Sequence, residues 1–278
     1  MAKTTEPKGT LVIIGGHEDK TGRKDILCEV SDRVRNGPLV IATVASTQAN
    51  ELWPEYKKIF TDLGVREVVH LDINDRAQAT DEKSLECVNG ARGVFFTGGD
   101  QLKITSQLGG TKICDLIRKI YYDGGVIAGT SAGAAAMSST MIVSGPSDST
   151  VKAKGDVAMA PGLDLVDDII VDQHFSERGR LSRLLGALAL NPRYLGVGID
   201  EDTAVVVYKR NMFRVLGRGS VYVLDAQAAT RLNISEVETD LESNLSIYGV
   251  RLSMLNEGEI FDTEERRPAK QKRTSRTH

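Results

Sequence analysis

The chain has 278 residues, of which 41% are hydrophobic and 26% are charged, and its formal net charge at pH 7 is −3. These are ordinary values for a globular protein with a sizeable core, and they give no indication of nucleic acid as a partner. No apolar run is long enough to cross a membrane, and residues 1–8 carry no signal-like stretch, so we expect no membrane contact and a cytoplasmic location.

Strands and helices are predicted to alternate along the first half of the chain. Short runs rich in β-branched residues, suited to strands buried on both faces, occupy residues 10–14, 39–44, 65–71, 93–97 and 126–129. Segments with helical periodicity lie between them at residues 25–34, 51–63, 81–88 and 112–122. This alternation predicts an α/β fold with a mostly parallel sheet flanked by helices.

The second half has a different pattern. Strands at residues 204–208, 213–216, 220–224 and 245–254 are separated by short polar turns, which predicts antiparallel strands added to the same sheet. Residues 9–262 are therefore expected to form one catalytic domain after a flexible segment, 1–8. Residues 263–278 are expected to be a disordered tail, because 266–278 hold six basic residues and no acidic one.

The sequence Gly129-Thr130-Ser131-Ala132-Gly133 follows the strand predicted at 126–129 and leads into the small residues 134–137. Gly-x-Ser-x-Gly between a strand and a helix is typical of a nucleophile elbow, in which a strained turn exposes the serine hydroxyl. The next backbone N–H, that of Ala132, is then directed at a developing oxyanion. Ser131 is therefore the predicted nucleophile of an acyl transfer.

A serine hydroxyl needs a base, usually histidine, and the chain has four histidines. His278 ends the basic tail, and His70 lies within a predicted strand. His17 follows a Gly-Gly turn and stays possible, although it has no local constellation of polar residues. His174 ends the apolar strand predicted at 169–173 and precedes a run of charged residues, so we assign His174 as the base.

The third member of such a site is a carboxylate that orients the histidine. The buried strand predicted at 195–199 leads directly into Asp200-Glu201-Asp202. Either Glu201 or Asp200 can reach His174 from the end of that strand, and a solvated turn is the alternative interpretation of the three acids.

Four segments together resemble the cyanophycinases, which share one serine peptidase family with the aspartyl dipeptidase called peptidase E. The segments are Phe96-Thr97-Gly98-Gly99-Asp100-Gln101, Gly129-Thr130-Ser131-Ala132-Gly133-Ala134, Asp172-Gln173-His174-Phe175 with the arginines that follow it, and Gly198-Ile199-Asp200-Glu201. The resemblance runs from about Gly9 to about Phe261. It implies a Ser131, His174, Glu201 triad, which selects Glu201 over Asp200. It also implies a fold like that of class I glutamine amidotransferases and a homodimer.

The resemblance further implies the substrate. Cyanophycin is a polymer with an aspartate backbone whose side-chain carboxyls carry arginine through isopeptide bonds, and a cyanophycinase releases β-Asp-Arg dipeptides from it. The oxyanion hole is expected to use Ala132 and Gly99. The residues expected to bind substrate are Gln101, Asp172, Gln173, Arg178, Arg180 and Arg183. Guanidinium groups bind carboxylates well, but Arg180 and Arg183 are one helical turn apart, so salt bridges on a helix face are the alternative.

Two other functions stay open. A peptidase E-like dipeptidase would act on short aspartyl peptides and would not need a site for arginine. A nucleotide-binding module would explain a glycine turn after the first strand, but residues 15–19 lack the Gly-x-Gly-x-x-Gly spacing. The three cysteines (Cys28, Cys87 and Cys114) fall in predicted helices without metal or disulfide spacing, so we expect no cofactor and no metal.

Overall fold

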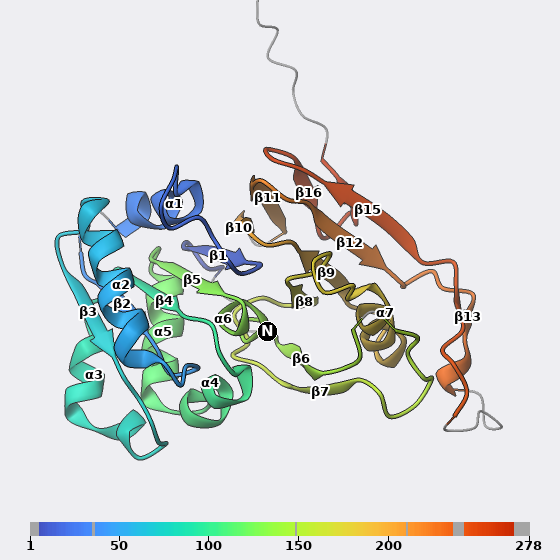
Figure 1. The fold of residues 1–278 in the computed structure, drawn as a ribbon, viewed down its shortest axis with the longest axis horizontal. Coiled ribbons are helices and arrows are strands. Elements are labelled where there is room, and N and C mark those ends of the chain that lie inside the picture. Colours follow the sequence, from blue (N-terminus) through green and yellow to red (C-terminus); the bar gives the residue numbers. More distant parts are fainter. Residues whose placement is uncertain (1–5, 35–36, 148, 210, 236–241, 270–278) are drawn as a thin grey trace, which may run out of the picture.

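The computed structural model describes residues 6–34, 37–147, 149–209, 211–235 and 242–269. Its first half alternates strands and helices, which confirms the predicted mixed α/β fold (Figure 1). The elements of this half are β1 (Thr10–Ile14), α1 (Asp25–Val34), β2 (Leu39–Ala42), α2 (Ala49–Asp62), β3 (Val68–Leu71), α3 (Glu82–Val88), β4 (Gly93–Phe96), α4 (Gln101–Leu108), α5 (Lys112–Tyr122), β5 (Val126–Thr130) and α6 (Ala132–Ala135), with a 3-10 turn at Gln78–Thr80.

The second half consists mainly of strands. Its elements are β6 (Thr140–Ser144), β7 (Ala158–Pro161), β8 (Ile169–Gln173), α7 (Leu181–Leu190), β9 (Leu195–Ile199), β10 (Thr203–Lys209), β11 (Met212–Gly217), β12 (Val221–Asp225), β13 (Arg231–Leu232), β14 (Ile247–Tyr248), β15 (Arg251–Leu255), β16 (Ile260–Asp262) and β17 (Arg267–Pro268), with a 3-10 turn at Asn233–Ser235.

The larger sheet has nine strands in the order β17-β16-β11-β10-β1-β5-β4-β2-β3. The pairs from β1 through β5, β4 and β2 to β3 are parallel, whereas β10 pairs antiparallel with β1. The loops that follow β1, β4 and β5 therefore leave the sheet at the same edge. Ligands of open α/β sheets bind at this edge, beyond the carboxyl ends of the strands.

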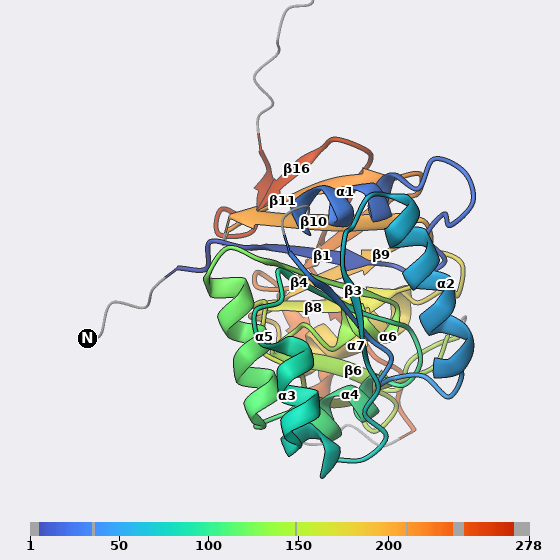
Figure 2. The ribbon, with the colours of Figure 1, turned by 90° about the vertical axis from the view of Figure 1, so that its left-hand side faces the viewer.

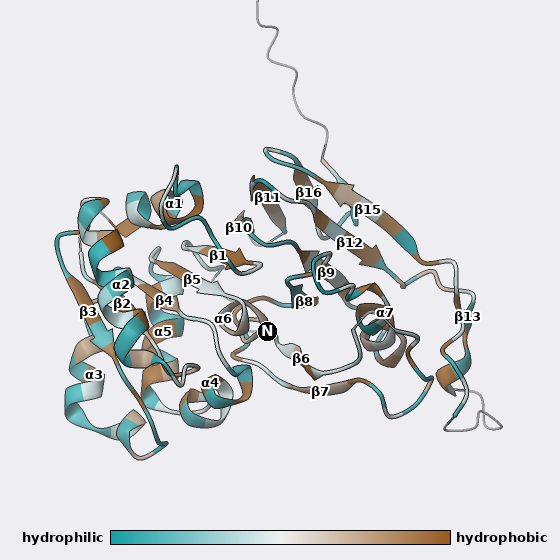
Figure 3. Ribbon diagram, viewed as in Figure 1, coloured by the Kyte–Doolittle hydropathy of each residue, from teal (hydrophilic) through white to brown (hydrophobic). Residues whose placement is uncertain are grey.

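The two faces of the parallel strands are covered by different elements. Val12 and Ile14 of β1 pack in a cluster with α1 and α2, while Leu11 and Ile13 pack in a cluster that includes α4, α5 and the second sheet. Figure 2 shows α2 and α5 on opposite sides of the parallel strands. Both faces of β1 are buried, which explains its unbroken apolar sequence, visible as the brown arrow in Figure 3.

The prediction that every later strand extends one sheet is wrong. β10, β11, β16 and β17 do extend the larger sheet, but β12 and β15 join β9 and β8 in a second sheet of order β15-β12-β9-β8. The chain changes sheets at the turn after β11, where the side chain of Asp200, at the end of β9, accepts a hydrogen bond from the Ser220 N–H (3.1 Å). This hydrogen bond joins the end of β9 to the turn at which the chain passes from the larger sheet to the second one.

The last described residues continue the larger sheet beyond residue 262. β17 pairs antiparallel with β16, and the side chain of Arg266 donates to Asp225 (2.7 Å). Residues 263–269 of the expected tail thus belong to the folded body, whereas 270–278, including His278, lie outside the described residues. Among the described residues, no helix combines the length and apolar character that a membrane span requires.

Candidate active site

Ser131 occupies a strained turn between β5 and α6. Its φ of 54° and ψ of −112° are unusual for a residue with a side chain, and its N–H is held by the Ile14 carbonyl (3.0 Å). The two flanking glycines are required by close contacts. A Cβ atom on Gly129 would lie 2.6 Å from the backbone of Gly133, and a Cβ on Gly133 would lie 2.6 Å from the Phe96 carbonyl oxygen. The Gly-x-Ser-x-Gly motif therefore allows a tight turn that presents the Ser131 hydroxyl at the sheet edge.

His174 follows β8 and lies next to Ser131. Its Nε2 is 3.0 Å from Ser131 Oγ, and its backbone N–H donates to the Gly15 carbonyl (2.8 Å). A Cβ on Gly16 would approach the imidazole Cε1 to 2.2 Å, so the ring rests directly on this glycine. The Gly15-Gly16 turn thus sets the position of His174, and the side chain of His174 is only 4% exposed.

The two acids after β9 have different partners. Glu201 Oε1 lies 2.6 Å from His174 Nδ1. Asp200 is buried, and its carboxylate accepts backbone N–H groups of Ser176 (3.0 Å) and Ser220 (3.1 Å). Glu201 therefore faces the imidazole, and Asp200 holds together the turns that carry the site.

His17, which the sequence left without a constellation, contacts the same glutamate. Its Nδ1 lies 2.9 Å from Glu201 Oε2, and its ring lies 5.0 Å from the His174 ring in an edge-on arrangement. The sequence signal that points to His17 is its position just after β1, because β1 lies between β5 and β10 in the larger sheet. Ligand atoms of His17, His174 and Glu201 lie within 4.8 Å of one another, as a divalent metal would need, but each carboxylate oxygen is already paired with an imidazole nitrogen.

The titration of the site follows from these contacts. Burial lowers the pKa of His174 below its ordinary value of 6.5, and the hydrogen bond with Glu201, which acts in the opposite direction, does not offset this. For Glu201, partial burial raises the pKa, but hydrogen bonds with His174 and His17 outweigh it and leave the pKa below its ordinary value. The arrangement thus favours a neutral His174 next to an ionised Glu201.

The structure does not bring most of the expected substrate-binding residues to the cleft. Asp172 is 1% exposed and receives the Arg183 guanidinium, with 2.7 Å between Arg183 Nε and Asp172 Oδ2. Arg180 is also buried and donates to the Gln173 carbonyl (2.6 Å) and side chain. Asp172, Gln173, Arg180 and Arg183 thus pair with one another below the cleft wall, and their role in substrate binding stays a prediction. A buried carboxylate loses its hydration and needs cationic or hydrogen-bonding partners within the protein.

Three further observations concern the other residues expected to bind substrate. Gln101 Nε2 donates to the carbonyls of Ile142 (2.9 Å) and Val143 (3.1 Å), so it links α4 to β6. Burial lowers the pKa of Arg180 to about 10. Of the three arginines expected to bind substrate, only Arg178 is exposed and lines the cleft at Ser131.

The cleft has a volume of about 960 Å³ and includes Ser131, His174 and His17 in its wall. The four carboxylates that line the cleft all accept hydrogen bonds from other groups of the protein. Glu18 accepts from Thr130 Oγ1 (2.6 Å) and from Tyr56, and Asp19 accepts from backbone N–H groups. Glu55 accepts from Lys20 (2.7 Å), and Asp100 accepts from the Leu102 N–H (2.8 Å).

Two cations of the cleft stand apart from this pattern. Lys103 on α4 and Arg178 after β8 have no carboxylate partner among the residues that the structure describes. The cleft therefore offers two cations that make no ion pair with another described residue. Sequence reasoning found Arg178 but missed Lys103, which lies two residues beyond the expected Gln101.

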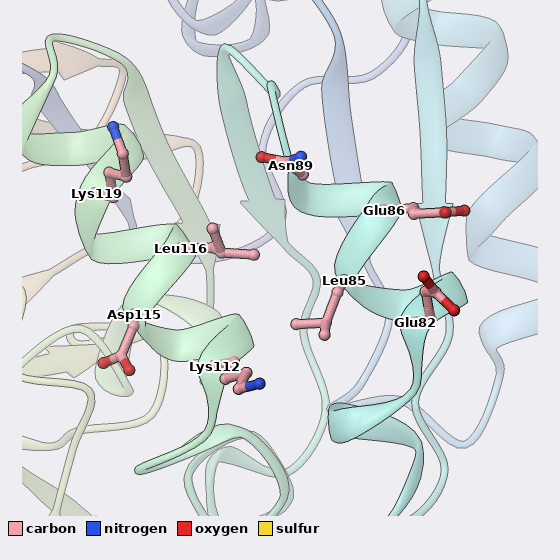
Figure 4. Close-up of a pocket in the computed structure, with 8 residues that line it drawn as sticks. All are labelled: Glu82, Leu85, Glu86, Asn89, Lys112, Asp115, Leu116 and Lys119. Carbon is pink, nitrogen blue, oxygen red and sulfur yellow. The ribbon is translucent and has the colours of Figure 1, made fainter.

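A second hollow, between α3 and α5, is shown in Figure 4 and shares no lining residue with the cleft. Leu85 and Leu116 form its apolar part, and charged side chains surround them. No histidine or serine is among the residues that line this hollow.

The loop after β4 lies against the nucleophile. A Cβ on Gly98 would be 3.5 Å from Ser131 Cβ, which is ordinary contact, whereas Gly99 has a φ of 143° and a Cβ there would be 2.1 Å from the Ala45 carbonyl oxygen. The Gly98-Gly99 turn is thus packed next to the nucleophile, and Gly99 fixes the turn on the Ala45 backbone.

Gly99→Val is expected to reduce turnover by about 10²-fold or more, because the side chain must move the turn and with it one oxyanion donor. Gly64→Val is the matched control, since Gly64 also has a positive φ (90°) but nothing lies within 4 Å of its Cβ position. Steady-state turnover of both variants is the measurement. Unchanged activity in Gly99→Val would exclude this loop from the site.

The sequence of this chain is similar to that of a known peptidase family. The model of peptidase family S51 matches residues 11–215. A cyanophycinase of Synechococcus elongatus is 38% identical over 269 residues, which cover 94% of this chain and 83% of that protein. A cyanophycinase of Geminocystis herdmanii is 37% identical over 265 residues, which cover 94% of this chain and 96% of that protein.

The fold also has a solved counterpart. The crystal structure of a peptidase from an acI-B1 Actinobacterium matches with a TM-score of 0.68 at 20% identity, covering 93% of this chain and 98% of that one. At this identity the likeness concerns the fold alone, a mixed α/β architecture.

Proposed function

This chain belongs to peptidase family S51, and from that membership we propose that it is a serine-type hydrolase that degrades cyanophycin to β-Asp-Arg dipeptides. Cyanophycinases at 37–38% identity over 94% of the chain support the substrate. The observation that carries the chemistry is the hydrogen-bonded series from Ser131 Oγ through the His174 imidazole to Glu201.

The proposed mechanism proceeds through an acyl-enzyme. Ser131 Oγ attacks the scissile carbonyl while His174 Nε2 takes its proton, and Glu201 stabilises the imidazolium that forms. The N–H groups of Ala132 and of the Gly98-Gly99 turn stabilise the oxyanion. His174 then protonates the leaving amine, and a water molecule, deprotonated in turn by His174, hydrolyses the ester on Ser131 and restores the hydroxyl.

The test is to incubate purified protein with cyanophycin granules and to identify the soluble products. We expect β-Asp-Arg dipeptides, no release with Ser131→Ala, and covalent labelling of Ser131 by a fluorophosphonate. Cleavage of α-linked aspartyl dipeptides, with intact granules, would instead indicate the peptidase E-like activity. Absence of labelling together with intact granules would contradict a serine hydrolase altogether.

We propose that Lys103 and Arg178 bind free carboxylates of the substrate, because every arginine attached through an isopeptide bond keeps its own α-carboxylate. Lys103→Gln and Arg178→Gln should each raise KM for a β-Asp-Arg oligomer by about fivefold to tenfold, the scale of one partly exposed charged contact. Lys83→Gln, on the exposed surface of α3, is the control. An oligomer with amidated arginine carboxylates should bind wild type and both variants equally weakly; equal binding of the free and amidated oligomers by wild type would contradict this role.

The pH dependence of kcat/KM should follow the titration of the His174 imidazole. A base must be neutral to accept a proton, and burial lowers the pKa of His174. Activity is therefore expected to be lost as the pH falls through a His174 pKa that lies below its ordinary value of 6.5. In Arg178→Gln this loss of activity should occur at a higher pH than in wild type, because the Arg178 charge contributes to lowering the His174 pKa. A limb centred at or above pH 6.5 in wild type would contradict His174 as the base.

Three finer expectations from the sequence stay predictions. These are the fold like that of class I glutamine amidotransferases, the homodimer and the cytoplasmic location. Analytical ultracentrifugation of the purified chain tests the homodimer.

A further inference from the structure

We propose that His17 is a positioning residue of the reaction, which holds Glu201 in the orientation that serves His174; this inference rests on the proposed function. The two oxygens of Glu201 are shared between two imidazoles, Oε1 with His174 Nδ1 at 2.6 Å and Oε2 with His17 Nδ1 at 2.9 Å. With both oxygens engaged, the plane of the carboxylate is fixed.

Glu201 needs such support because of its place in the fold. It lies in the turn between β9 and β10, and 27% of its side chain is exposed. A glutamate side chain has three rotatable bonds, and one contact leaves it free to turn about the axis of that contact. Its N–H is bonded to Glu177 (3.1 Å), which fixes the backbone but not the carboxylate. His17 supplies the second point of contact.

His17 is itself held in place by the backbone around it. The Gly16 carbonyl accepts from the Asp202 N–H (2.9 Å), and the Asp19 N–H donates to Asp202 Oδ1 (2.8 Å). These two bonds join the loop after β1 to the turn that carries Glu201. His17 adopts a φ of 47° between them, so its side chain projects toward the carboxylate although 69% of it is exposed.

The same contacts determine where the imidazole protons lie. An ionised carboxylate only accepts hydrogen bonds, so the Nδ1 of both imidazoles must carry a proton. A neutral His174 with its proton on Nδ1 leaves Nε2 free to accept the proton of Ser131. Holding both Glu201 oxygens as acceptors therefore favours the tautomer of His174 that the reaction requires.

The choice of variants follows from the contact atom. His17→Asn places an amide Nδ2–H where the imidazole Nδ1–H lies, and asparagine tolerates a positive φ. His17→Ala removes the donor. The Ala variant should lower kcat by about tenfold with KM within about twofold of wild type, as expected for one hydrogen bond to a charged group, whereas the Asn variant should stay within about threefold.

The rate of fluorophosphonate labelling of Ser131 is the second readout, because the reagent needs an activated serine but no substrate pocket. It should fall in His17→Ala by the same factor as kcat, and this result is independent of whether cyanophycin is the substrate. In a Glu201→Gln background, His17→Ala should have no further effect, since it acts through Glu201.

Several outcomes would overturn the proposal. One is wild-type labelling and kcat in a folded His17→Ala variant. Another is an increase in KM alone, which would make His17 a substrate ligand. A third is an equal loss of kcat in the Ala and Asn variants. An undiminished effect of His17→Ala in the Glu201→Gln background would show that His17 does not act through the carboxylate. Thermal unfolding of each variant verifies that the fold is retained.

Discussion

Ser131→Ala is expected to lower turnover by several orders of magnitude, and His174→Ala should do the same. The hydroxyl and the imidazole, 3.0 Å apart, act as one unit in acyl transfer, so removing either abolishes the covalent route. The double variant should therefore be scarcely less active than each single one. The measurement is steady-state hydrolysis of a β-Asp-Arg oligomer, with Ser106→Ala on the exposed side of α4 as the control.

The fold of these variants should be retained. Among the described residues, the side chain of Ser131 hydrogen-bonds to His174 alone, whereas the turn itself is held by the Ile14 carbonyl and by the glycines on either side. Appreciable hydrolysis of the polymer by a folded Ser131→Ala variant would refute the assignment of the nucleophile.

Glu201→Gln is expected to reduce kcat by about 10³-fold to 10⁴-fold, while Asp200→Asn should leave kcat per folded molecule near that of wild type. The amide that replaces the carboxylate in the first variant has no charge to stabilise the imidazolium of His174, and it can present the wrong hydrogen-bonding group to Nδ1. Asp200 makes no such contact, because its two oxygens accept backbone N–H groups.

Asp200→Asn should instead be visible in stability. An asparagine retains one acceptor and sets an NH₂ group against a backbone donor, so the free energy of unfolding should fall by about 1–3 kcal/mol. Denaturant unfolding and kcat measured on the same preparations separate the two effects. A larger loss of kcat in Asp200→Asn than in Glu201→Gln would move the triad acid to Asp200.

Local sequence predicted much of the scaffold because its signals are short-range. Strands β1, β2, β4 and β5 are short runs in which every residue is buried, whereas the edge strand β3 is only partly buried. The residues of the elbow need glycine at positions 129 and 133 for contacts within their own turn and with β4. Strand ends also indicated where His174 and Glu201 enter the site. The choice of Glu201 over Asp200 came from the resemblance.

Local sequence did not distinguish the environments of the three arginines after His174. Arg178, Arg180 and Arg183 are alike in sequence, and each can bind a carboxylate of the substrate or of the protein. They differ in burial: Arg180 and Arg183 are each 7% exposed and pair within the protein, while Arg178 is exposed at the cleft. Exposure depends on how β8 and α7 pack, which no local pattern contains.

The sequence by itself therefore determined the parallel α/β half, the elbow at Ser131 and the strand ends that carry His174 and Glu201, because backbone sterics and apolar periodicity act over a few residues. Only the tertiary structure decided the second sheet, the burial of Asp172 with its arginines, the position of Lys103 in the cleft and the contact of His17 with Glu201. These depend on which loops meet at one sheet edge, and that is settled by packing between segments far apart in the chain.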